Sequence, residues 1–406
     1  MSQARESERW RVLRESWLDN RVVILGLLAL AAALFVLYAL VGQDQYHNDG
    51  WFPLADSFLH GRLWIDGSRP WIERVPGPNG EWFLPFPPIP ALVLVPQVAL
   101  FGPDVADTGG MSALLGALNI FLVYALLTCF DLKGKAIAVL MIAFFVGSEY
   151  FYVAATGGIH HWTEILVVTF LLAALNLALR GRWPWVGGIL FGLAVGCRPS
   201  VLPAAPAFAL LYWRAGGIRP LVELTIGAAS IGLFLAWYNW ARFGSPTEFG
   251  YDLITGPNGE KVLDEPWYAK GIESPFYIAR GLYTMFLRGF EFDEAFPWLK
   301  PSWAGTSVLL TMPFLVYLGR AVWKSPLILV GWLGLLPLVL DLMHGNPGFA
   351  QFGYRFILDG MPFIWMLLAM VVARNGLTRG FVAAVVAGVV VNSYGLACIA
   401  AGFITT

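Results

Sequence analysis

Ionisable side chains gather at the ends of apolar segments in this chain of 406 residues. Asp44 and Asp49 follow the first apolar run, and charge at the edge of a membrane is costly to keep without a use. Four later stretches are also polar at such edges: "GGIHHWTE" (157–164), "GCRPS" (196–200), "YNWARFGSPTEFGY" (238–251) and "HGNPGFAQFGYRFILDG" (344–360). If these stretches converge, they combine carboxylates, imidazoles and arginines at the membrane surface.

That mixture suits one class of chemistry. Arginine binds phosphate oxygens with two parallel N–H groups, and a carboxylate can take a proton from an attacking hydroxyl. A phosphate at the level of the lipid headgroups indicates a lipid-linked phosphate, so we expect transfer of a group from it to an acceptor. The candidate bases are Asp49 and Asp44. The candidate substrate-binding residues are His160, His161, Glu164, Arg198, Arg242, Tyr354 and Arg355.

Each candidate also has a structural interpretation. Asp49 is a favoured residue type for capping a following helix, and Asp44 could simply be solvated. His161 and Glu164 are three residues apart, a spacing that suits a metal site on one helix face. Interfacial polar residues are the favoured interpretation, so no metal site is assigned, although a divalent cation is left open as a cofactor.

The two arginines have similar alternatives. Arg198 either binds phosphate or pairs with a local carbonyl or carboxylate. Arg355 is four residues before Asp359, so an ion pair within one helix competes with ligand contact.

The composition is that of a membrane protein. The chain is 58% hydrophobic and 13% charged, with a mean hydropathy of +0.65, whereas soluble domains carry about 25% charged residues. A net charge of −1 gives no overall attraction to nucleic acid. The three cysteines lie in or beside apolar segments, which favours neither disulfides nor zinc. No cleavable signal peptide is expected, because the first apolar run is long enough to span.

We expect a single all-α polytopic domain over residues 1–406, since a spanning helix needs about 20 mostly apolar residues. Eleven spans are predicted, at 21–41, 110–130, 136–155, 162–180, 184–197, 199–213, 220–241, 304–319, 325–343, 355–373 and 380–402. The pair 184–197 and 199–213 is short and broken by prolines, as is tolerated where backbone lines a cavity. The proline-rich segment 84–101 is predicted to lie at the interface.

Lys and Arg concentrate in the short segments between spans on one side, which predicts a cytoplasmic N-terminus. Two long loops, 42–109 and 242–303, then face outward. Both contain "GPNGE", at 77–81 and 256–260, which favours a hairpin in each. Residues 52–63 have apolar side chains at helical spacing, so the first loop should carry an amphipathic helix ending near Gly61.

The order of motifs resembles the GT-C class of integral membrane glycosyltransferases, such as protein mannosyltransferases and aminoarabinose transferases of lipid A. The resemblance is carried by "LADSFLHGRL" after an acidic residue, "PFPPIPALVLVP", "YNWARFGSPTEFGY" and "QFGYRFILDGMPF". It covers most of the chain as a pattern and implies a GT-C-like bundle with juxtamembrane helices in the first loop.

The resemblance further implies an inverting transfer from a polyprenyl-phosphate sugar to a lipid, glycan or protein hydroxyl. Asp49 matches the general base best, and Asp44 remains an alternative because the offset varies. Glu164 and Arg198 match a second acidic and a basic position. The chain departs from the family in having "HNDG" instead of an Asp-Glu pair. The implied location is a bacterial inner membrane with the site on the periplasmic face.

Three other functions remain open. A transporter or flippase would be expected to show repeated halves and charges near the bilayer midplane. A polymerase or ligase of the O-antigen type would centre on one large loop such as 242–303. A non-catalytic scaffold is the third alternative, against which the outward His, Arg and Asp residues argue.

Overall fold

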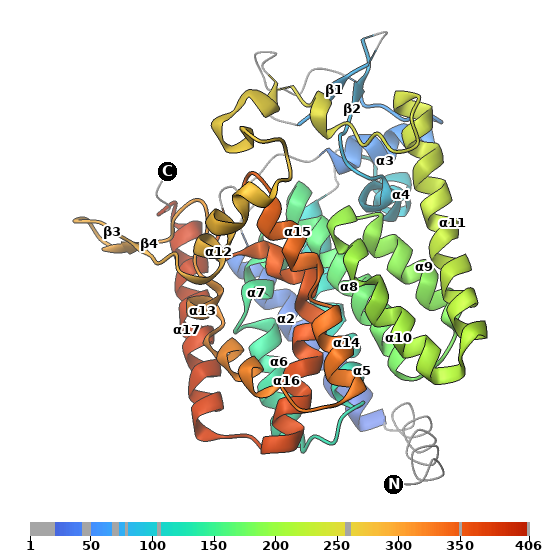
Figure 1. Ribbon diagram of the computed structural model, residues 1–406. Helices are drawn as coiled ribbons and strands as arrows, with labels where there is room; N and C mark the ends of the chain where they lie inside the picture. Colours follow the sequence, from blue (N-terminus) through green and yellow to red (C-terminus); the bar gives the residue numbers. More distant parts are fainter. Residues whose placement is uncertain are drawn as a thin grey trace.

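The computed structural model describes residues 21–42, 50–66, 73–77, 80–103, 107–255, 261–348 and 351–403. The fold is all-α and polytopic, with two short β-hairpins (Figure 1). Its α-helices are α2 (Arg21–Val41), α3 (Trp51–Leu59), α4 (Ile89–Phe101), α5 (Thr108–Leu127), α6 (Gly134–Phe145), α7 (Glu149–Thr156), α8 (Ile159–Leu179), α9 (Pro184–Val195), α10 (Ala205–Gly216), α11 (Ile218–Phe243), α12 (Ile278–Phe286), α13 (Val308–Thr311), α14 (Pro326–Leu333), α15 (Pro337–Met343), α16 (Met361–Asn375) and α17 (Arg379–Ala400).

Short 3₁₀ helices interrupt or precede several of these elements, and four of them begin at a proline, which lacks a backbone donor. Three of the 3₁₀ helices lie in the bundle: η2 (Pro199–Ala204), η7 (Pro313–Arg320) and η8 (Arg355–Gly360). Four more shape the second long loop: η3 (Tyr251–Leu253), η4 (Val262–Asp264), η5 (Pro266–Tyr268) and η6 (Pro275–Tyr277).

The length and apolarity of its helices indicate that the protein is embedded in a membrane. Within the described residues, seven segments could cross a bilayer, namely Arg21–Val41, Thr108–Leu127, Ile159–Leu179, Ile218–Phe243, Pro326–Met343, Arg355–Asn375 and Arg379–Ala400. The pair α6 and α7, bent by 53°, would make an eighth.

The predicted count of eleven spans is therefore not confirmed. The three further segments predicted to span, 184–197, 199–213 and 304–319, contain helices that are short or broken by prolines. α9 has 12 residues, and η7 follows a single turn of α13. At 1.5 Å per residue, α9 is about 18 Å long, less than a hydrocarbon layer about 30 Å thick.

The first long loop carries the predicted local structures. The amphipathic helix is α3, whose buried side includes Phe52 and Ala55, and Gly61 follows it with a φ of +70°. The first "GPNGE" joins β1 (Val75–Pro76) to β2 (Trp82–Phe83) in an antiparallel hairpin, as predicted. Residues 256–260 lie outside the described residues, but an antiparallel bridge joins Thr255 and Lys261 on either side.

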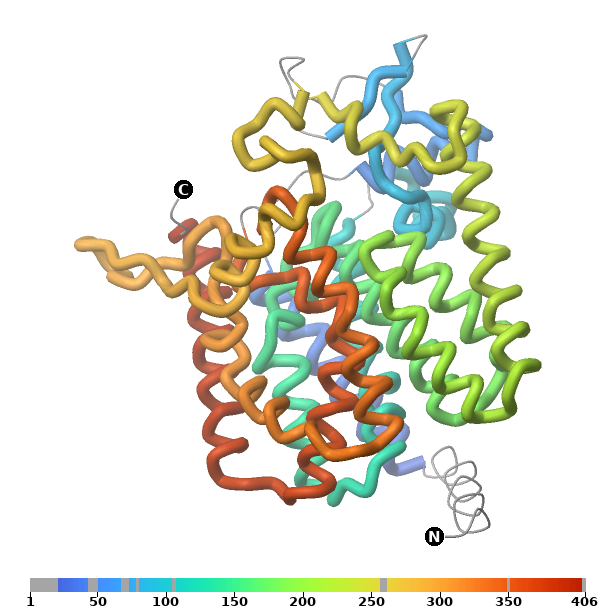
Figure 2. Tube along the Cα trace, in the orientation of Figure 1, coloured from blue at the N-terminus to red at the C-terminus, as the bar shows by residue number. Residues whose placement is uncertain are grey.

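The two long loops pack together over one end of the bundle (Figure 2). Arg74 of the first loop and Thr255 of the second form an antiparallel bridge, with the Thr255 N–H donating to the Arg74 carbonyl at 3.0 Å. α4, the helix within predicted segment 84–101, packs along α3 beneath this cover. The loops therefore form a cap, and the space beneath them is bounded by the bundle.

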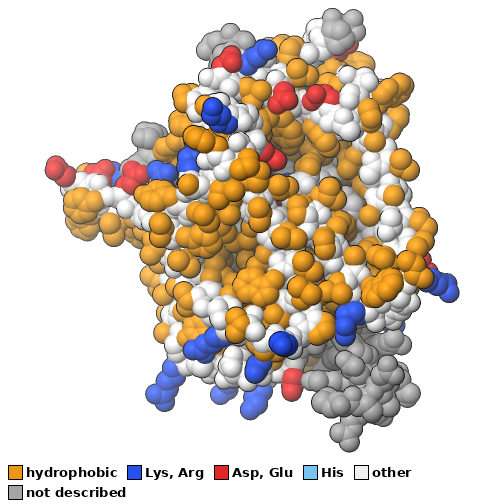
Figure 3. Space-filling view, viewed as in Figure 1, with side chains coloured by type: hydrophobic (Ala, Val, Ile, Leu, Met, Phe, Trp, Pro, Cys, Tyr) orange, Lys and Arg blue, Asp and Glu red, His pale blue; other side chains and the backbone are white. Residues whose placement is uncertain are grey.

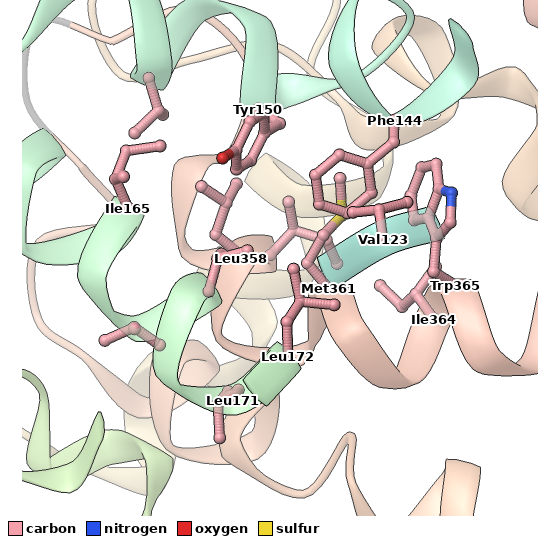
Figure 4. Packing of buried hydrophobic residues seen from close by; sticks show 14 of the residues in the cluster. Val123, Phe144, Tyr150, Ile165, Leu171, Leu172, Leu358, Met361, Ile364 and Trp365 are labelled. Atoms are coloured by element: carbon pink, nitrogen blue, oxygen red, sulfur yellow. The ribbon is translucent and has the colours of Figure 1, made fainter. Parts of the chain in front are cut away.

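The core centres on α16, which is almost wholly enclosed by its neighbours. Figure 4 shows Trp365 of α16 beside Phe144 of α6 and Val123 of α5, with Leu358 and Met361 between them and α8. The rings of Phe144 and Trp365 are 4.8 Å apart, edge to face, a favourable aromatic geometry. Helices α2 and α11 are mostly exposed, which leaves their apolar surfaces facing the surroundings of the bundle.

Basic side chains collect at the end of the bundle opposite the cap (Figure 3). The exposed Lys and Arg residues of the short connections are Lys133, Lys135, Arg182, Arg214, Arg219, Arg320, Lys324, Arg374 and Arg379. The two ends of the molecule thus differ strongly in charge.

Candidate functional site

A cavity of about 220 Å³ lies between the cap and the bundle. Its floor comes from the first turn of α8, the break between α9 and η2, the end of α15 and the start of η8. Its roof comes from the two long loops. Six separate parts of the chain therefore meet at this cavity.

Arg198 lies in the floor and contacts three carboxylates. Its Nε donates to Asp359 Oδ2 at 3.0 Å, Nη1 to Glu164 Oε1 at 3.4 Å, and Nη2 to Asp341 Oδ1 at 3.3 Å. Ser200 donates a further hydrogen bond to Asp359 Oδ2 at 2.7 Å. A planar guanidinium with five N–H donors can serve several acceptors at once, whereas an ammonium group cannot fix this geometry.

Arg355 is the second floor arginine. Its Nη1 donates to Glu164 Oε1 at 2.5 Å. Among the described residues no other hydrogen bond is made by its guanidinium, so N–H groups remain for a ligand. Phe356 is approached by both guanidinium groups, with Arg198 Cζ at 4.8 Å and Arg355 Cζ at 4.7 Å from the ring centre. Both cations are close enough to the ring for its π electrons to attract them.

The floor holds more negative than positive groups: three carboxylates face two arginines. One oxygen of each carboxylate, Glu164 Oε2, Asp341 Oδ2 and Asp359 Oδ1, is buried without a hydrogen-bond partner among the described residues. Each carboxylate is thus only half satisfied, and the cluster depends on its arginines to remain buried.

The local sequence explains how both arginines reach the floor. Pro199 ends the α9 region, and Arg198 takes an extended conformation immediately before η2. Arg355 begins η8 after a turn in which Gly353 has a φ of +71°, where a side chain is unfavourable. A Cβ at Gly353 would collide with the carboxylate of Glu149 in α7. Close packing of α7 on this turn therefore fixes the start of η8.

The roof contributes two acidic residues. Glu73 of the first loop and Glu273 of the second line the cavity. Burial raises the pKa of Glu73 to about 6, although Arg355 lowers it and Glu265 adds to the rise. Burial also raises the pKa of Glu273. A carboxylate with a pKa near neutrality is suited to accept a proton.

His344 lies at the cavity edge, and its backbone forms an antiparallel β-bridge with that of Glu273. Burial lowers its pKa to about 4, partly offset by a backbone hydrogen bond to Asn346, and nearby arginines lower it further. The imidazole is therefore neutral near pH 7.

Aromatic rings line the rest of the cavity. Trp51, Phe86 and Tyr251 lie on one side, and Phe86 meets the His160 ring edge to face at 5.7 Å. Trp51 is fixed by a hydrogen bond from its Nε1 to the Ile159 carbonyl at 2.7 Å. Rings beside carboxylates and arginines give a surface that can contact both an apolar face and a charged group.

The structure places the predicted residues in three groups. His160, Arg198 and Arg355 line the cavity, and Glu164 lies behind them, fully buried. Asp44 and Asp49 lie outside the described residues. Trp51, two residues after Asp49 in the sequence, is part of the lining.

The other three predicted residues lie outside the cavity lining. His161 Nδ1 is 2.8 Å from Thr156 Oγ1, and Tyr354 donates its hydroxyl to the Asp341 carbonyl at 3.2 Å. Arg242 donates to the Leu84 carbonyl at 2.5 Å and to Asn239 at 2.9 Å, with its guanidinium 4.0 Å from the ring centre of Tyr238. It therefore ties α11 to the first loop.

The structure also bears on the structural alternatives of two side chains. Arg198 pairs with carboxylates, as one of its two interpretations predicted. The Arg355–Asp359 pair within one helix is not, because Arg355 binds Glu164 and Asp359 binds Arg198. Within the described part of the chain, no group of three His, Cys, Asp or Glu residues is placed to hold a metal ion.

Sequence reasoning missed Glu73, Asp341 and Glu273. Asp341 lies inside an apolar segment (325–343), and a charged residue within a predicted span is itself a signal of function. Glu73 and Glu273 lie in long polar loops, where nothing in the local pattern separates them from solvated residues. Comparison of the chain with protein-family models, with curated proteins and with solved structures found no match.

Proposed function

We propose that this protein is a membrane glycosyltransferase that moves a sugar from a polyprenyl-phosphate donor to an acceptor hydroxyl. The observation that carries the proposal is one cavity that combines two arginines, roof carboxylates and aromatic rings at one end of an apolar bundle. Arginines suit a phosphate, and rings with carboxylates suit a sugar. The motif resemblance to GT-C enzymes supports the same class.

Arg355 binds the donor phosphate through the N–H groups that Glu164 does not occupy, and Arg198 adds positive charge beside it. Glu164, Asp341 and Asp359 keep the arginine side chains in place from behind. Arg198 is a weaker ligand than Arg355 in this arrangement because all three of its nitrogen atoms already contact carboxylates.

In the reaction, a carboxylate of the first loop accepts the proton of the acceptor hydroxyl. The acceptor oxygen forms a bond to the anomeric carbon while the bond from that carbon to the phosphate oxygen breaks. The configuration inverts, and polyprenyl phosphate leaves with both electrons of the broken bond. Because the phosphate leaves as an anion held by arginine, no general acid is needed.

Three carboxylates of the first loop compete for the role of base. Asp49 and Asp44 are the candidates from the motif pattern. Glu73 is the candidate from geometry, because it lines the cavity and its pKa is about 6. All three variants therefore belong in one experiment.

The orientation follows from charge. Lys and Arg collect at the end opposite the cavity (Figure 3), and positive residues favour the cytoplasmic side. We infer that the N-terminus is cytoplasmic and that the cavity faces the periplasm from a bacterial inner membrane.

The test is reconstitution in lipid nanodiscs with polyprenyl-phosphate sugars and membrane acceptors, measuring released polyprenyl phosphate. We expect release by the wild type, strong loss in Arg355→Gln, and near wild-type release per folded molecule in the control Arg242→Gln. Loss in only one of Asp49→Asn, Asp44→Asn and Glu73→Gln identifies the base. No release from any donor by the folded wild type would contradict the proposal.

A transporter is the second candidate, favoured by the discontinuous pair α6 and α7 with Glu149 buried at the break. It predicts movement of an intact lipid-linked sugar across a sealed vesicle membrane without release of polyprenyl phosphate. The same donors, followed for sidedness instead of cleavage, separate the two functions.

A further inference from the structure

A β-hairpin of the second long loop projects sideways from the bundle (Figure 1). It consists of β3 (Glu291–Phe292) and β4 (Leu299–Lys300), which pair antiparallel. The register sets Glu291 opposite Lys300 and Phe292 opposite Leu299. Since successive side chains of a strand point to opposite faces, the hairpin has one charged face and one apolar face.

The apolar side is large and exposed. Phe292 is 77% exposed, Phe296 66%, Trp298 55% and Leu299 49%. Figure 3 shows apolar atoms along the side of this arm that faces the opposite end of the bundle, with charged atoms along the other side. Four large apolar side chains on one small hairpin would be unfavourable in water.

The charged face is internally organised. Lys300 Nζ is 2.5 Å from Asp293 Oδ2, and Arg288 Nη2 is 3.6 Å from Glu291 Oε1. The Ala295 N–H also donates to Asp293 Oδ1 at 2.8 Å. These contacts order the turn, so the direction of the apolar face is fixed by structure.

The hairpin is attached to α17 near its C-terminal end. Tyr394 donates its hydroxyl to the Pro297 and Leu299 carbonyls, and the Phe296 ring lies 6.2 Å from that of Phe403. From Arg379 to Tyr394 the helix rises about 22 Å, and a hydrocarbon layer is about 30 Å thick. With Arg379 at one interface, Tyr394 lies about 8 Å short of the other, a depth at which an amphipathic element buries its apolar face in the leaflet.

We propose that this hairpin is an interfacial arm that lies on the lipid leaflet at the cavity end of the bundle. Its apolar face continues the lipid-facing surface of α17, where Val386 and Val390 are exposed below it. Aromatic side chains with a polar opposite face are favoured at this depth of a bilayer. The occupant of the apolar face is thus phospholipid, and this inference is independent of the reaction that the cavity performs.

The experiment uses the full chain in nanodiscs of phosphatidylethanolamine and phosphatidylglycerol. A photoreactive benzoylphenylalanine replaces Phe292 in one sample and its neighbour Glu291, on the charged face, in another. Replacement of Val390 on α17 provides the positive control. After illumination, mass spectrometry of the protein measures lipid adducts.

We expect lipid adducts at positions 292 and 390, and several-fold fewer at 291. Equal labelling at 291 and 292, or labelling at 390 without labelling at 292, would overturn the proposal. Crosslinks from 292 to a second copy of the chain or to another protein would also overturn it and identify a protein interface. If the Phe292 sample does not fold, its cross-strand partner Leu299 provides the same test.

Discussion

Replacing Arg198 with methionine tests the buried charge cluster most directly. The change removes the guanidinium that contacts Asp359, Glu164 and Asp341 at 3.0, 3.4 and 3.3 Å. The three carboxylates are almost wholly buried and would face one another with only Arg355 as a cation. A methionine has a similar stem, so the loss is mainly of charge.

The expected cost is about 3–5 kcal/mol, the range found when one partner of a buried ion pair is removed. With an unfolding entropy of about 2.1 cal/mol/K per residue, this corresponds to a melting temperature lower by roughly 4–6 °C. The melting temperature of Arg198→Lys should lie between those of the wild type and Arg198→Met. The lysine keeps the positive charge, but one ammonium group cannot reach three carboxylates in fixed geometry.

Thermal unfolding in detergent can be followed with a thiol-reactive dye, since Cys197 and Cys398 are buried in the folded chain. The control is Arg219→Met, which removes an exposed arginine paired with Glu223 at 3.0 Å. This change should cost no more than about 0.5 kcal/mol.

A double variant tests whether unpaired buried carboxylates cause the loss of stability. Adding Asp359→Asn to Arg198→Met removes one of the unpaired negative charges and should restore part of the lost stability, so the two changes are not additive. If Arg198→Met melts at the same temperature as the Arg219→Met control, or if the double variant loses the sum of the single losses, the buried carboxylates do not depend on Arg198 for their stability.

If Glu73 is the base, donor turnover should rise as the pH increases through about 6, because only the deprotonated carboxylate accepts a proton; an unchanged profile in Glu73→Gln would exclude that role. Gly353→Ala should cost at least about 1–2 kcal/mol from its φ of +71° alone, and more from collision with Glu149; a wild-type melting temperature would show that this turn is not fixed by α7. Arg242→Gln should lower stability by about 1–3 kcal/mol, because it leaves the Leu84 carbonyl without its donor. It should leave the KM for the donor unchanged, and a raised KM would place Arg242 at the substrate.

Much of the local structure could be predicted from the sequence. Apolar length predicts helices such as α2, α8 and α17, since an apolar segment of this length must satisfy its own backbone groups in lipid. Pro-Asn-Gly predicts the hairpin between β1 and β2, and the spacing of Phe52 and Ala55 predicts α3. These features depend on neighbouring residues only, which is why a sequence pattern can reveal them.

The candidate site depended on contacts between distant residues. Arg198 and Asp359 are 161 positions apart, and Arg355 and Glu164 are 191 positions apart. Glu73 and Glu273 reach the cavity only because the two long loops pack together over the bundle. No local sequence pattern specifies contacts between such distant residues. The sequence therefore could not distinguish Glu73 and Glu273 from solvated loop residues.

The Arg355–Asp359 spacing illustrates the difference. In an α-helix, residues four apart share a face, which predicts a pair. The chain instead forms the 3₁₀ helix η8 over Arg355–Gly360, in which three residues complete a turn and residues four apart diverge. Sequence alone determined that these two charges stand at the end of an apolar segment. The tertiary structure decided their partners, because packing of α7, α8 and η2 around η8 directs each charge to a different element.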